Sequence, residues 1–317
     1  MERAFSFLIS KPDGGKRFDH FLREQNLSLS RSRIKQLIDA GRFLVNDRLV
    51  KPGLKLKPGD QISGLVPAPR SLEVRGEEIP LDILHEDVHV VVVNKAPGMV
   101  VHPAPGNYGG TLVNALLFHC QDLSGINGVL RPGIVHRLDK FTSGVMVAAK
   151  NDLAHESLVK QFRNRTVEKR YLAVVYGHLP KPVGMIDASL GRHPKKRTMI
   201  SIHTRSPREA ITHWRVLEDL AYFTLLEILP KTGRTHQIRV HLSSIGHPIL
   251  GDPVYSRGKN LKRIENGSVK GLVAGFPRQA LHASYLRFLH PETGEPVDFH
   301  APLADDMEEI IGLLRAR

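Results

Sequence analysis

Strand-like apolar runs outnumber helical patterns in the last three quarters of this chain and do not alternate with them regularly. The strand-like runs span residues 88–93, 145–149, 171–176, 211–217 and 222–229. The helical patterns span residues 112–118, 153–162 and 235–245. A doubly wound parallel fold needs strands and helices in alternation. The pattern therefore predicts an α+β fold built on a mixed, mainly antiparallel sheet.

Positive charge is concentrated near the N-terminus. Residues 1–75 carry 15 Lys and Arg against 8 Asp and Glu, a net of +7 out of +13 for the whole chain. A localised excess of this kind favours a binding module for a polyanion such as nucleic acid. The alternative is a basic but otherwise ordinary solvated surface.

The same segment has the pattern of a small α/β unit. Phe18, Phe21 and Leu22 have the i, i+3, i+4 spacing of a helix face. A second helix, with Ile34, Leu37 and Ile38 inward, is expected to end at Gly41. Asn46-Asp47 is a hairpin-turn signal between strands 43–45 and 48–50. The candidate RNA-binding cations on and after the second helix are Arg31, Arg33, Lys35 and Arg42.

These patterns predict four parts in the chain. A tail is expected over residues 1–15 and the basic unit over 16–65. A Pro- and Gly-containing linker is expected over 66–77 and a large catalytic domain over 78–317.

Cysteine usage and hydropathy point to the cytoplasm. Cys120 is the single cysteine, which excludes a disulfide framework and a thiolate metal cluster. No run approaches the roughly 18 apolar residues of a membrane span, and the N-terminus lacks a signal-peptide pattern. His236 and His241 are five residues apart, a poor spacing for one helix face, so no metal site is expected.

Asp139 is the leading candidate for a reacting group. It stands in His136-Arg137-Leu138-Asp139-Lys140, just before the buried run 145–149. A carboxylate in such a position can be a nucleophile, a general base or a metal ligand. The four residues ending at Asp139 also match a kinase catalytic loop, but no phosphate-binding glycine loop or Asp-Phe-Gly accompanies them.

Two downstream segments supply candidate partners for this carboxylate. Thr235 is expected to cap a helix that buries Ile238 and Leu242, which leaves Arg234 in a turn where it can meet a carboxylate. Arg239 and His241 are expected to face solvent or bind phosphate. Tyr171 opens a strand beside two cations, where it can pack in the core or stack on a base.

Several motifs together resemble the RluA/RluD family of pseudouridine synthases. They are His136-Arg137-Leu138-Asp139-x-x-Thr142-Ser143-Gly144, Gly233-Arg234-Thr235-His236-Gln237-Ile238-Arg239, Asn94-Lys95-Ala96-Pro97-Gly98, Lys169-x-Tyr171, Gly246-His247-Pro248-Ile249-x-Gly251-Asp252 and Arg278-Gln279-Ala280-Leu281-His282-Ala283. The segment from Lys16 to about Leu65 resembles the S4-type RNA-binding module, on Arg17-Phe18-Asp19, Ser30-Arg31-Ser32-Arg33, Gly41-Arg42 and Val45-Asn46. With this module in front, the chain is most similar to the RluD branch, whose members act on large-subunit ribosomal RNA.

The resemblance implies isomerisation of uridine to pseudouridine in RNA without a cofactor or metal. Asp139 would be the catalytic carboxylate, and Arg234 would pair with it to keep it ionised and oriented. Tyr171 would stack on the base and could help to remove the C5 proton. Arg137 would fill the gap left by the flipped uridine, and Leu281 would pack under the base. Expected phosphate contacts are Lys195, Lys196, Arg197, Arg257, Lys259, Lys262 and Arg263.

The sequence is compatible with several alternatives for the reaction route, the RNA target and the function. The route of Asp139 can be attack on C1′, attack on C6 or elimination through a glycal. The target can be ribosomal RNA, free or in an assembling large subunit, or transfer RNA. A non-catalytic RNA-binding or ribosome-assembly factor of the same fold is the alternative function.

Overall fold

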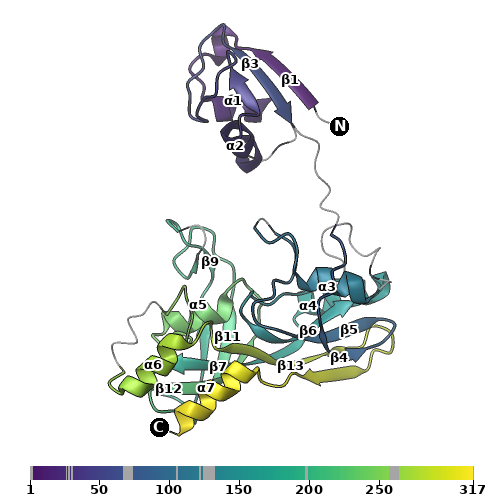
Figure 1. Cartoon of the computed structure of the whole chain (residues 1–317), viewed down its shortest axis with the longest axis vertical. Coiled ribbons are helices and arrows are strands. Elements are labelled where there is room, and N and C mark those ends of the chain that lie inside the picture. The colour runs from purple at the N-terminus through teal and green to yellow at the C-terminus, as the bar shows by residue number, and fades with distance from the viewer. Residues whose placement is uncertain are drawn as a thin grey trace. The chain divides into compact units, whose positions relative to one another are not determined.

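The computed structural model of the chain consists of two compact units, Met1–Leu72 and Glu73–Arg317 (Figure 1). It describes residues 3–66 except 26, 28 and 30, residues 74–120 except 105, residue 123, residues 133–256 except 197 and 198, and residues 264–316. For residues 31–33 it describes the backbone alone.

The N-terminal unit combines a three-stranded antiparallel sheet with two α-helices. The elements are β1 (Arg3–Leu8), the 3₁₀ helix η1 (Lys11–Asp13), α1 (Phe18–Glu24), α2 (Arg31–Asp39), β2 (Phe43–Val45) and β3 (Gln61–Val66). The strand order is β1-β3-β2. The expectation of a tail over residues 1–15 is wrong, because β1 pairs with β3 from Arg3 opposite Val66 to Leu8 opposite Gln61. Phe7 of this strand also packs edge-on against Phe21, with ring centroids 5.8 Å apart.

Both predicted helix faces of this unit are confirmed by a shared core. Phe18, Phe21 and Leu22 of α1 are buried against Ile34, Leu37 and Ile38 of α2. The predicted turn at Asn46-Asp47 is also confirmed, since both residues have positive φ.

The second strand expected after this turn is reduced to one bridge between Val45 and Arg48. β2 pairs with β3 instead. The pairing sets Phe43 opposite Gly64, where a Cβ would overlap the Phe43 ring. The Phe43 ring therefore packs closely over this glycine in the β2–β3 pair.

The C-terminal unit is built on one mixed sheet and confirms the predicted α+β class. Its strands are β4 (Asp82–Glu86), β5 (Val90–Lys95), β6 (Ser143–Ala149), β7 (Glu168–Tyr176), β8 (Val183–Asp187), β11 (Ile211–Asp219), β12 (Phe223–Pro230), β13 (Leu281–Leu289) and β14 (Pro296–His300). The order is β4-β5-β6-β13-β7-β12-β11-β8, and β14 also pairs with β13. Among the described strands of this sheet, β6 and β13 form the single parallel pair.

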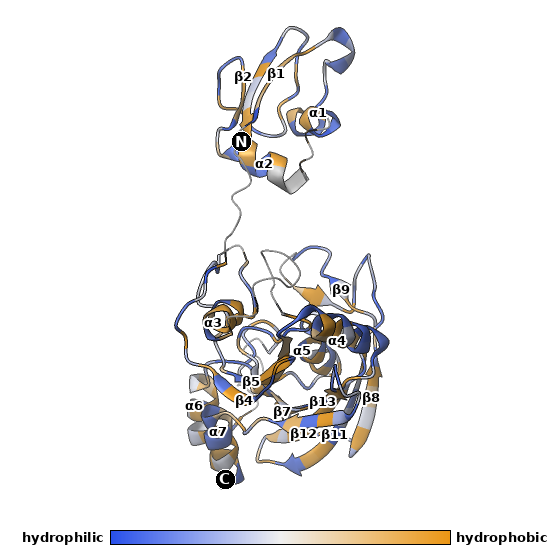
Figure 2. Ribbon diagram, turned by 90° about the vertical axis from the view of Figure 1, so that its right-hand side faces the viewer, coloured by the Kyte–Doolittle hydropathy of each residue, from blue (hydrophilic) through white to orange (hydrophobic). Residues whose placement is uncertain are grey.

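Two hydrophobic cores cover different parts of this sheet. The helices are α3 (Leu112–His119), α4 (Asp152–Asn164), α5 (Gln237–Ser244), α6 (Gly267–Gly275) and α7 (Asp305–Arg315). One core joins α3 and α4 to β5 and β6, and the apolar run of β5 is orange in Figure 2. The other core joins α5, α6 and α7 to β7, β11 and β12. Tyr171 on β7 packs against both cores and therefore marks their junction.

The parallel contact between β6 and β13 requires a glycine. Gly144 lies opposite Ala283, and its φ of 114° lies in a region that side-chain-bearing residues rarely adopt. A Cβ at this position would overlap the backbone of Ala283. This contact anchors the start of β6, and with it the turn that carries Asp139.

We expect Gly144→Ala to destabilise the C-terminal unit by about 3 kcal/mol, because it adds both backbone strain and an overlap. Gly312→Ala is the matched control, since Gly312 lies inside α7 with nothing within 4 Å of a new Cβ. Urea denaturation followed by the fluorescence of Trp214, the single tryptophan, measures both variants. Equal stability of the Gly144→Ala variant and the wild type would contradict the close approach.

Candidate active site

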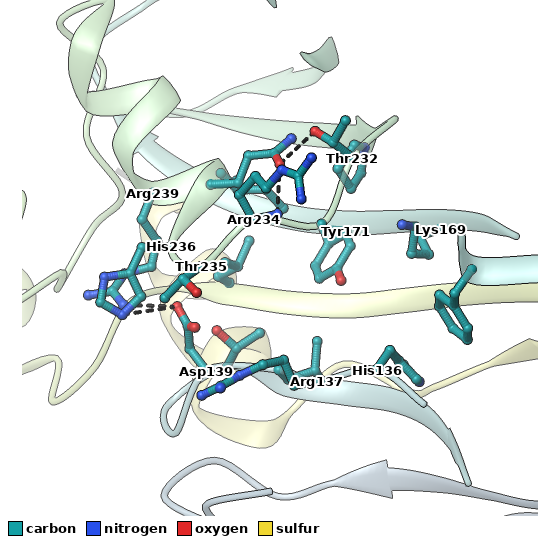
Figure 3. Close-up of a pocket in the computed structure, with 18 of the residues that line it drawn as sticks. His136, Arg137, Asp139, Lys169, Tyr171, Thr232, Arg234, Thr235, His236 and Arg239 are labelled. Atoms are coloured by element: carbon teal, nitrogen blue, oxygen red, sulfur yellow. Dashed lines mark hydrogen bonds and ion pairs between the residues drawn. The ribbon is translucent and has the colours of Figure 1, made fainter. Parts of the chain in front are cut away.

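A pocket of about 580 Å³ opens where the two cores of the C-terminal unit meet (Figure 3). Its walls come from the segment before β6, the end of α4, β7, the β12–α5 connection and the start of β13. Asp139 is the only acidic residue among the described lining residues. The lining cations are Arg137, Arg163, Arg165, Lys169, Lys231, Arg234 and Arg239. The pocket therefore suits an anionic ligand, and the Asp139 carboxylate is available there for chemistry.

The turn that carries Asp139 is tied down from both sides. The Thr142 amide donates to the Asp139 carbonyl oxygen at 3.0 Å. The buried Lys95 amine donates to the Lys140 carbonyl oxygen at 3.2 Å. Arg278 donates to the Phe141 carbonyl oxygen at 3.1 Å. These contacts give two of the quoted motifs, residues 94–98 and 278–283, a role in positioning Asp139.

Arg239, not Arg234, pairs with Asp139. The Arg239 Nη1 group donates to Asp139 Oδ2 at 2.9 Å. The Nε group of Arg234 donates instead to the Glu209 carbonyl oxygen at 3.1 Å. The expected pairing of Arg234 is therefore wrong, although Arg234 still lines the pocket. The helix α5 begins at Gln237, one residue later than a Thr235 cap would place it, and Arg239 in its first turn faces the carboxylate.

The start of α5 also differs from the prediction. The helix begins at Gln237, after His236 with a φ of 54°, and no Thr235 cap bond forms. The Gln237 Oε1 atom accepts the Arg234 amide at 3.0 Å and the Thr232 hydroxyl at 2.7 Å. This side chain replaces the expected cap, while Ile238 and Leu242 are buried as predicted.

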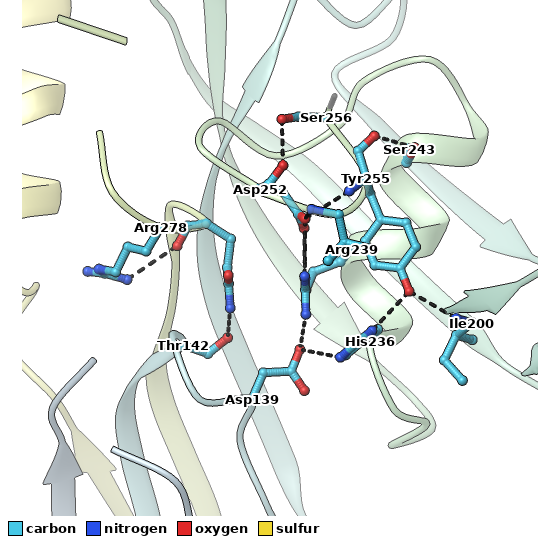
Figure 4. Close-up of polar contacts among 12 residues, drawn as sticks. Asp139, Thr142, Ile200, His236, Arg239, Ser243, Asp252, Tyr255, Ser256 and Arg278 are labelled. Atoms are coloured by element: carbon cyan, nitrogen blue, oxygen red, sulfur yellow. Dashed lines mark hydrogen bonds and ion pairs between the residues drawn. The ribbon is translucent and has the colours of Figure 1, made fainter. Parts of the chain in front are cut away.

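Asp252 holds Arg239 in place from the side opposite Asp139 (Figure 4). Arg239 Nε donates to Asp252 Oδ2 at 2.7 Å and Nη2 to Oδ1 at 3.1 Å, a bidentate pair. The amides of Val254 and Tyr255 donate to Asp252 Oδ1 at 2.8 and 2.9 Å. The Asp252 carboxylate thus binds Nε and Nη2 of Arg239 and fixes the guanidinium, so that the third nitrogen, Nη1, points at Asp139.

Arg239 and His241 are thus buried, against the expectation that they face solvent or bind phosphate. Arg239 is 5% exposed and His241 is 0% exposed. The two ring nitrogens of His241 bond to the Thr212 hydroxyl and the Ala188 carbonyl, each at 2.9 Å. The sequence held one signal that Arg239 could be buried, because Asp252 in the motif 246–252 offers it a carboxylate. Nothing in the sequence pattern, however, predicts that these two residues meet.

His236 forms a second contact with the catalytic candidate. Its Nε2 atom lies 3.9 Å from Asp139 Oδ2, and its Nδ1 atom bonds to the Tyr255 hydroxyl at 2.9 Å. The same hydroxyl accepts the Ile200 amide at 3.1 Å. Burial lowers the pKa of His236, against the attraction of Asp139, so the ring is neutral near pH 7.

Tyr171 projects into the pocket from β7, between the labelled side chains of Arg234 and Arg137 in the view of Figure 3. Burial, reinforced by the negative charge of Asp139, raises the pKa of its hydroxyl. The ring is therefore a neutral, partly buried aromatic surface. The structure also places Leu281, which is buried, and Arg137, which is exposed, in the pocket wall.

The other predicted RNA contacts lie outside this pocket lining or outside the description. Lys195 and Lys196 are exposed between β9 (Gly191–Arg192) and β10 (Ile200–Ser201). Arg42 is exposed as well, and Lys35 pairs with Asp39 at 2.8 Å on the surface of α2. Arg197, Arg257, Lys259, Lys262 and Arg263 lie outside the described residues, as do the side chains of Arg31 and Arg33.

One group of potential metal ligands lies outside the lining of the pocket. Ligand atoms of Glu86, His119 and Cys120 lie within 4.8 Å of one another. Lys150 Nζ, however, lies 2.7 Å from Glu86 Oε1, and His119 Nε2 lies 2.7 Å from Glu86 Oε2. Both carboxylate oxygens thus already have partners, and we assign no metal to this group.

His136 makes the stability of the site dependent on pH. The Val147 amide donates to its Nε2 atom at 3.0 Å, which requires an unprotonated nitrogen. Burial and nearby Lys169 lower the pKa of His136 to about 3. In the unfolded chain this pKa is about 6.5, so below that pH the unfolded state binds more protons.

We therefore expect the free energy of unfolding to fall as the pH drops from 6.5 toward 3, by at most about 1.4 kcal/mol per pH unit from this group. His136→Gln removes the titration and should flatten that slope in urea denaturation at stepped pH. His300→Gln, at a side chain 74% exposed, is the control that should leave the slope unchanged. A slope that His136→Gln does not alter would show that His136 does not cause it.

Comparison with known proteins agrees with this fold and site. Residues 89–244 match the model of the RNA pseudouridylate synthase family, and residues 16–62 match the S4 domain. The chain is 50% identical over 306 residues to an uncharacterized RNA pseudouridine synthase, YlyB, of Bacillus subtilis, with 96% of each chain covered. It is 46% identical over 308 residues to ribosomal large subunit pseudouridine synthase D of Zymomonas mobilis, covering 95% of this chain and 94% of that one.

Solved structures give the same result. Human RNA pseudouridylate synthase domain containing 4 is 28% identical, with a TM-score of 0.59 over 74% of this chain and 93% of that one. Human RNA pseudouridylate synthase domain containing 1 is 27% identical, with a TM-score of 0.55 over 76% and 97%. The chain belongs to the RNA pseudouridine synthase family, in its RluA/RluD group, and carries an S4 domain. It is a pseudouridine synthase with RNA as its substrate.

No helix in the described part of the chain is both long and apolar enough to cross a membrane.

Proposed function

We propose that this enzyme converts uridine to pseudouridine in large-subunit ribosomal RNA, with Asp139 as the catalytic carboxylate. The observation that carries the assignment of Asp139 is its position as the one acidic residue among the described pocket-lining residues, held by Arg239. The RNA target rests on relatives named ribosomal large subunit pseudouridine synthase D, which are 46% and 42% identical over 95% of this chain.

The reaction explains why a single carboxylate suffices. The bond between C1′ and N1 breaks, the base rotates, and a new bond forms between C1′ and C5. The proton leaves C5 and N1 gains one, so no oxidant, reductant or group donor is consumed. Positive charge builds at the sugar as the glycosidic bond breaks, and a carboxylate can stabilise or attack it. Attack of Asp139 on C1′, attack on C6 and a glycal route are all compatible with its position.

The neighbouring side chains fit the handling of a flipped base. We assign Tyr171 to stacking on the uracil ring, since its neutral aromatic face lies in the pocket. Leu281 would support the base from the start of β13. Arg137, exposed at the pocket, would enter the gap left in the RNA stack.

The N-terminal unit would hold the RNA electrostatically. Residues 1–66 carry 13 Lys and Arg against 7 Asp and Glu. Their removal is expected to weaken binding to ribosomal RNA and to flatten the dependence of log K on log salt, because fewer counterions are released. Filter binding over a salt series measures both quantities. Urea denaturation of the remaining chain, residues 67–317, first shows that this part folds alone. Unchanged affinity and slope would reject this role.

The test of the proposed function is a map of pseudouridines in a strain that lacks the gene. Loss of specific sites from large-subunit ribosomal RNA, restored by the wild-type gene and not by Asp139→Asn, is expected. Loss of pseudouridines from transfer RNA alone would show that transfer RNA, and not ribosomal RNA, is the target. Intact pseudouridine patterns, with every phenotype rescued by Asp139→Asn, would favour a ribosome-assembly factor.

A further inference from the structure

An ion pair at the pocket joins two segments that are far apart in the sequence. Arg165, at the C-terminal end of α4, meets Glu209, which precedes β11. Arg165 Nη1 donates to Oε1 at 3.0 Å and Nη2 donates to Oε2 at 2.7 Å. The Glu209 carbonyl oxygen also accepts Arg234 Nε at 3.1 Å. One acidic residue therefore contacts two arginines that line the pocket.

The backbone of Arg165 indicates that its side chain has a specific use. Its φ of 61° and ψ of 29° are left-handed, at a helix end where glycine is usually preferred. A side-chain-bearing residue costs roughly 1 kcal/mol or more in this conformation. The guanidinium is therefore kept at this position despite a local cost, which is a common feature of functional sites.

The ion pair between Arg165 and Glu209 contributes little to stability and can be replaced by another anion. The Arg165 and Glu209 side chains are 43% and 53% exposed. Exposed pairs contribute about 0–1 kcal/mol, so another anion can displace the carboxylate at little cost. A phosphate offers the guanidinium fork the same two-oxygen geometry as a carboxylate. No carboxylate pairs with the Arg234 guanidinium in the part of the chain that the structure describes.

We propose that Arg165 and Arg234 form a subsite for one backbone phosphate of the RNA, and that the Glu209 carboxylate occupies this subsite until RNA binds. The inference rests on the proposed function only in taking RNA as the ligand. Glu209 then lowers the affinity for every RNA by the cost of breaking its pair. At a given RNA concentration, an RNA that makes few other contacts loses the largest share of its occupancy. The pair therefore favours RNAs that contact the whole enzyme.

The experiment is a double-mutant cycle on the full-length chain. The probe is a fluorescein-labelled single-stranded oligouridylate of about ten nucleotides, a length within the usual site size of single-strand binders. Anisotropy at several KCl concentrations gives Kd and its salt dependence for Glu209→Gln, Arg165→Gln and the double variant. Glu218→Gln is the matched control, because Glu218 forms a similar bidentate pair with Arg315, and Arg315, unlike Arg165, does not line the pocket.

We expect Glu209→Gln to bind the probe about 3- to 5-fold more tightly, within the energy of an exposed pair. Arg165→Gln should bind it about 5-fold more weakly, with a salt slope shallower by roughly 0.7, the value for one single-strand phosphate. The double variant should match Arg165→Gln, since Glu209 acts only through the arginine, and Glu218→Gln should match the wild type.

The proposal is overturned if Glu209→Gln weakens binding as Arg165→Gln does, because the pair would then only support the pocket wall. A gain that persists without Arg165, or an affinity that no substitution changes, also overturns it. These readouts need no turnover. A failure of the enzyme to modify ribosomal RNA would therefore reject the proposed target and leave this comparison valid.

Discussion

Asp139→Asn should form no detectable pseudouridine, a loss of at least about 10³-fold in the single-turnover rate constant. The substitution replaces the reactive oxygen pair by an amide of the same shape, which can neither attack the sugar or ring nor take up a proton. Folding should be retained, because Arg239 keeps its bidentate contact with Asp252 and the turn keeps its backbone anchors. Tritium release from C5-labelled RNA measures the reaction, and Trp214 fluorescence in urea measures the fold.

Asp305→Asn is the control for this experiment, since Asp305 is an exposed residue in the first turn of α7. It should turn over at the wild-type rate. Retained activity of the Asp139→Asn variant, at more than a few per cent of wild type, would remove Asp139 from the chemistry. Loss of activity accompanied by unfolding would instead assign Asp139 a structural role.

The second large effect is expected at Arg239, in contrast with Arg234. Arg239→Gln leaves the Asp252 carboxylate buried without its cation and frees Asp139 from its partner. Breaking a buried pair in this way costs about 3–5 kcal/mol of stability. The rate constant should also fall by about 10²-fold or more, because the carboxylate loses its orientation.

Arg239→Lys separates the two contributions. Lysine keeps the positive charge but lacks the planar fork, so it cannot reach both Asp252 oxygens and Asp139 at once. We expect it to restore part of the stability while the rate constant stays low. Single-turnover kinetics at saturating RNA, alongside urea denaturation, measure the two effects separately.

Arg234→Gln provides the comparison. Its guanidinium contacts the Glu209 carbonyl oxygen and not Asp139, so its removal should weaken RNA binding and leave the saturated rate constant within about 3-fold of wild type. If Arg234→Gln lowered the saturated rate as strongly as Arg239→Gln, the pairing derived from sequence would be restored and that seen in the structure rejected.

Sequence reasoning succeeded wherever the signal was local. Helix faces such as Phe18, Phe21 and Leu22, the Asn46-Asp47 turn and the strand over residues 145–149 follow from side-chain period and turn chemistry. It failed where a residue's neighbour lies far along the chain. The N-terminal strand at Arg3–Leu8 carries only two phenylalanines as a signal, and its identity comes from pairing with residues 61–66.

The arginine assignment failed for the same reason. Arg234 and Arg239 lie five residues apart in one motif, and both are compatible with an ion pair to Asp139 on composition. Which of them forms it depends on where α5 begins, and that is set by the Gln237 side chain bonding back to Thr232 and Arg234. It depends further on Asp252, which holds the guanidinium from a separate loop.

By itself, the sequence determined the class of fold, the basic N-terminal unit and Asp139 as the reacting carboxylate to test. These follow from period, charge and motif, which act over a few residues. Only the tertiary structure decided that Arg239 is the partner of Asp139, 100 residues away along the chain, and that Glu209 bridges Arg165 and Arg234. Such contacts arise when two separate cores pack at one junction, and the geometry of that packing is not a property of any local segment.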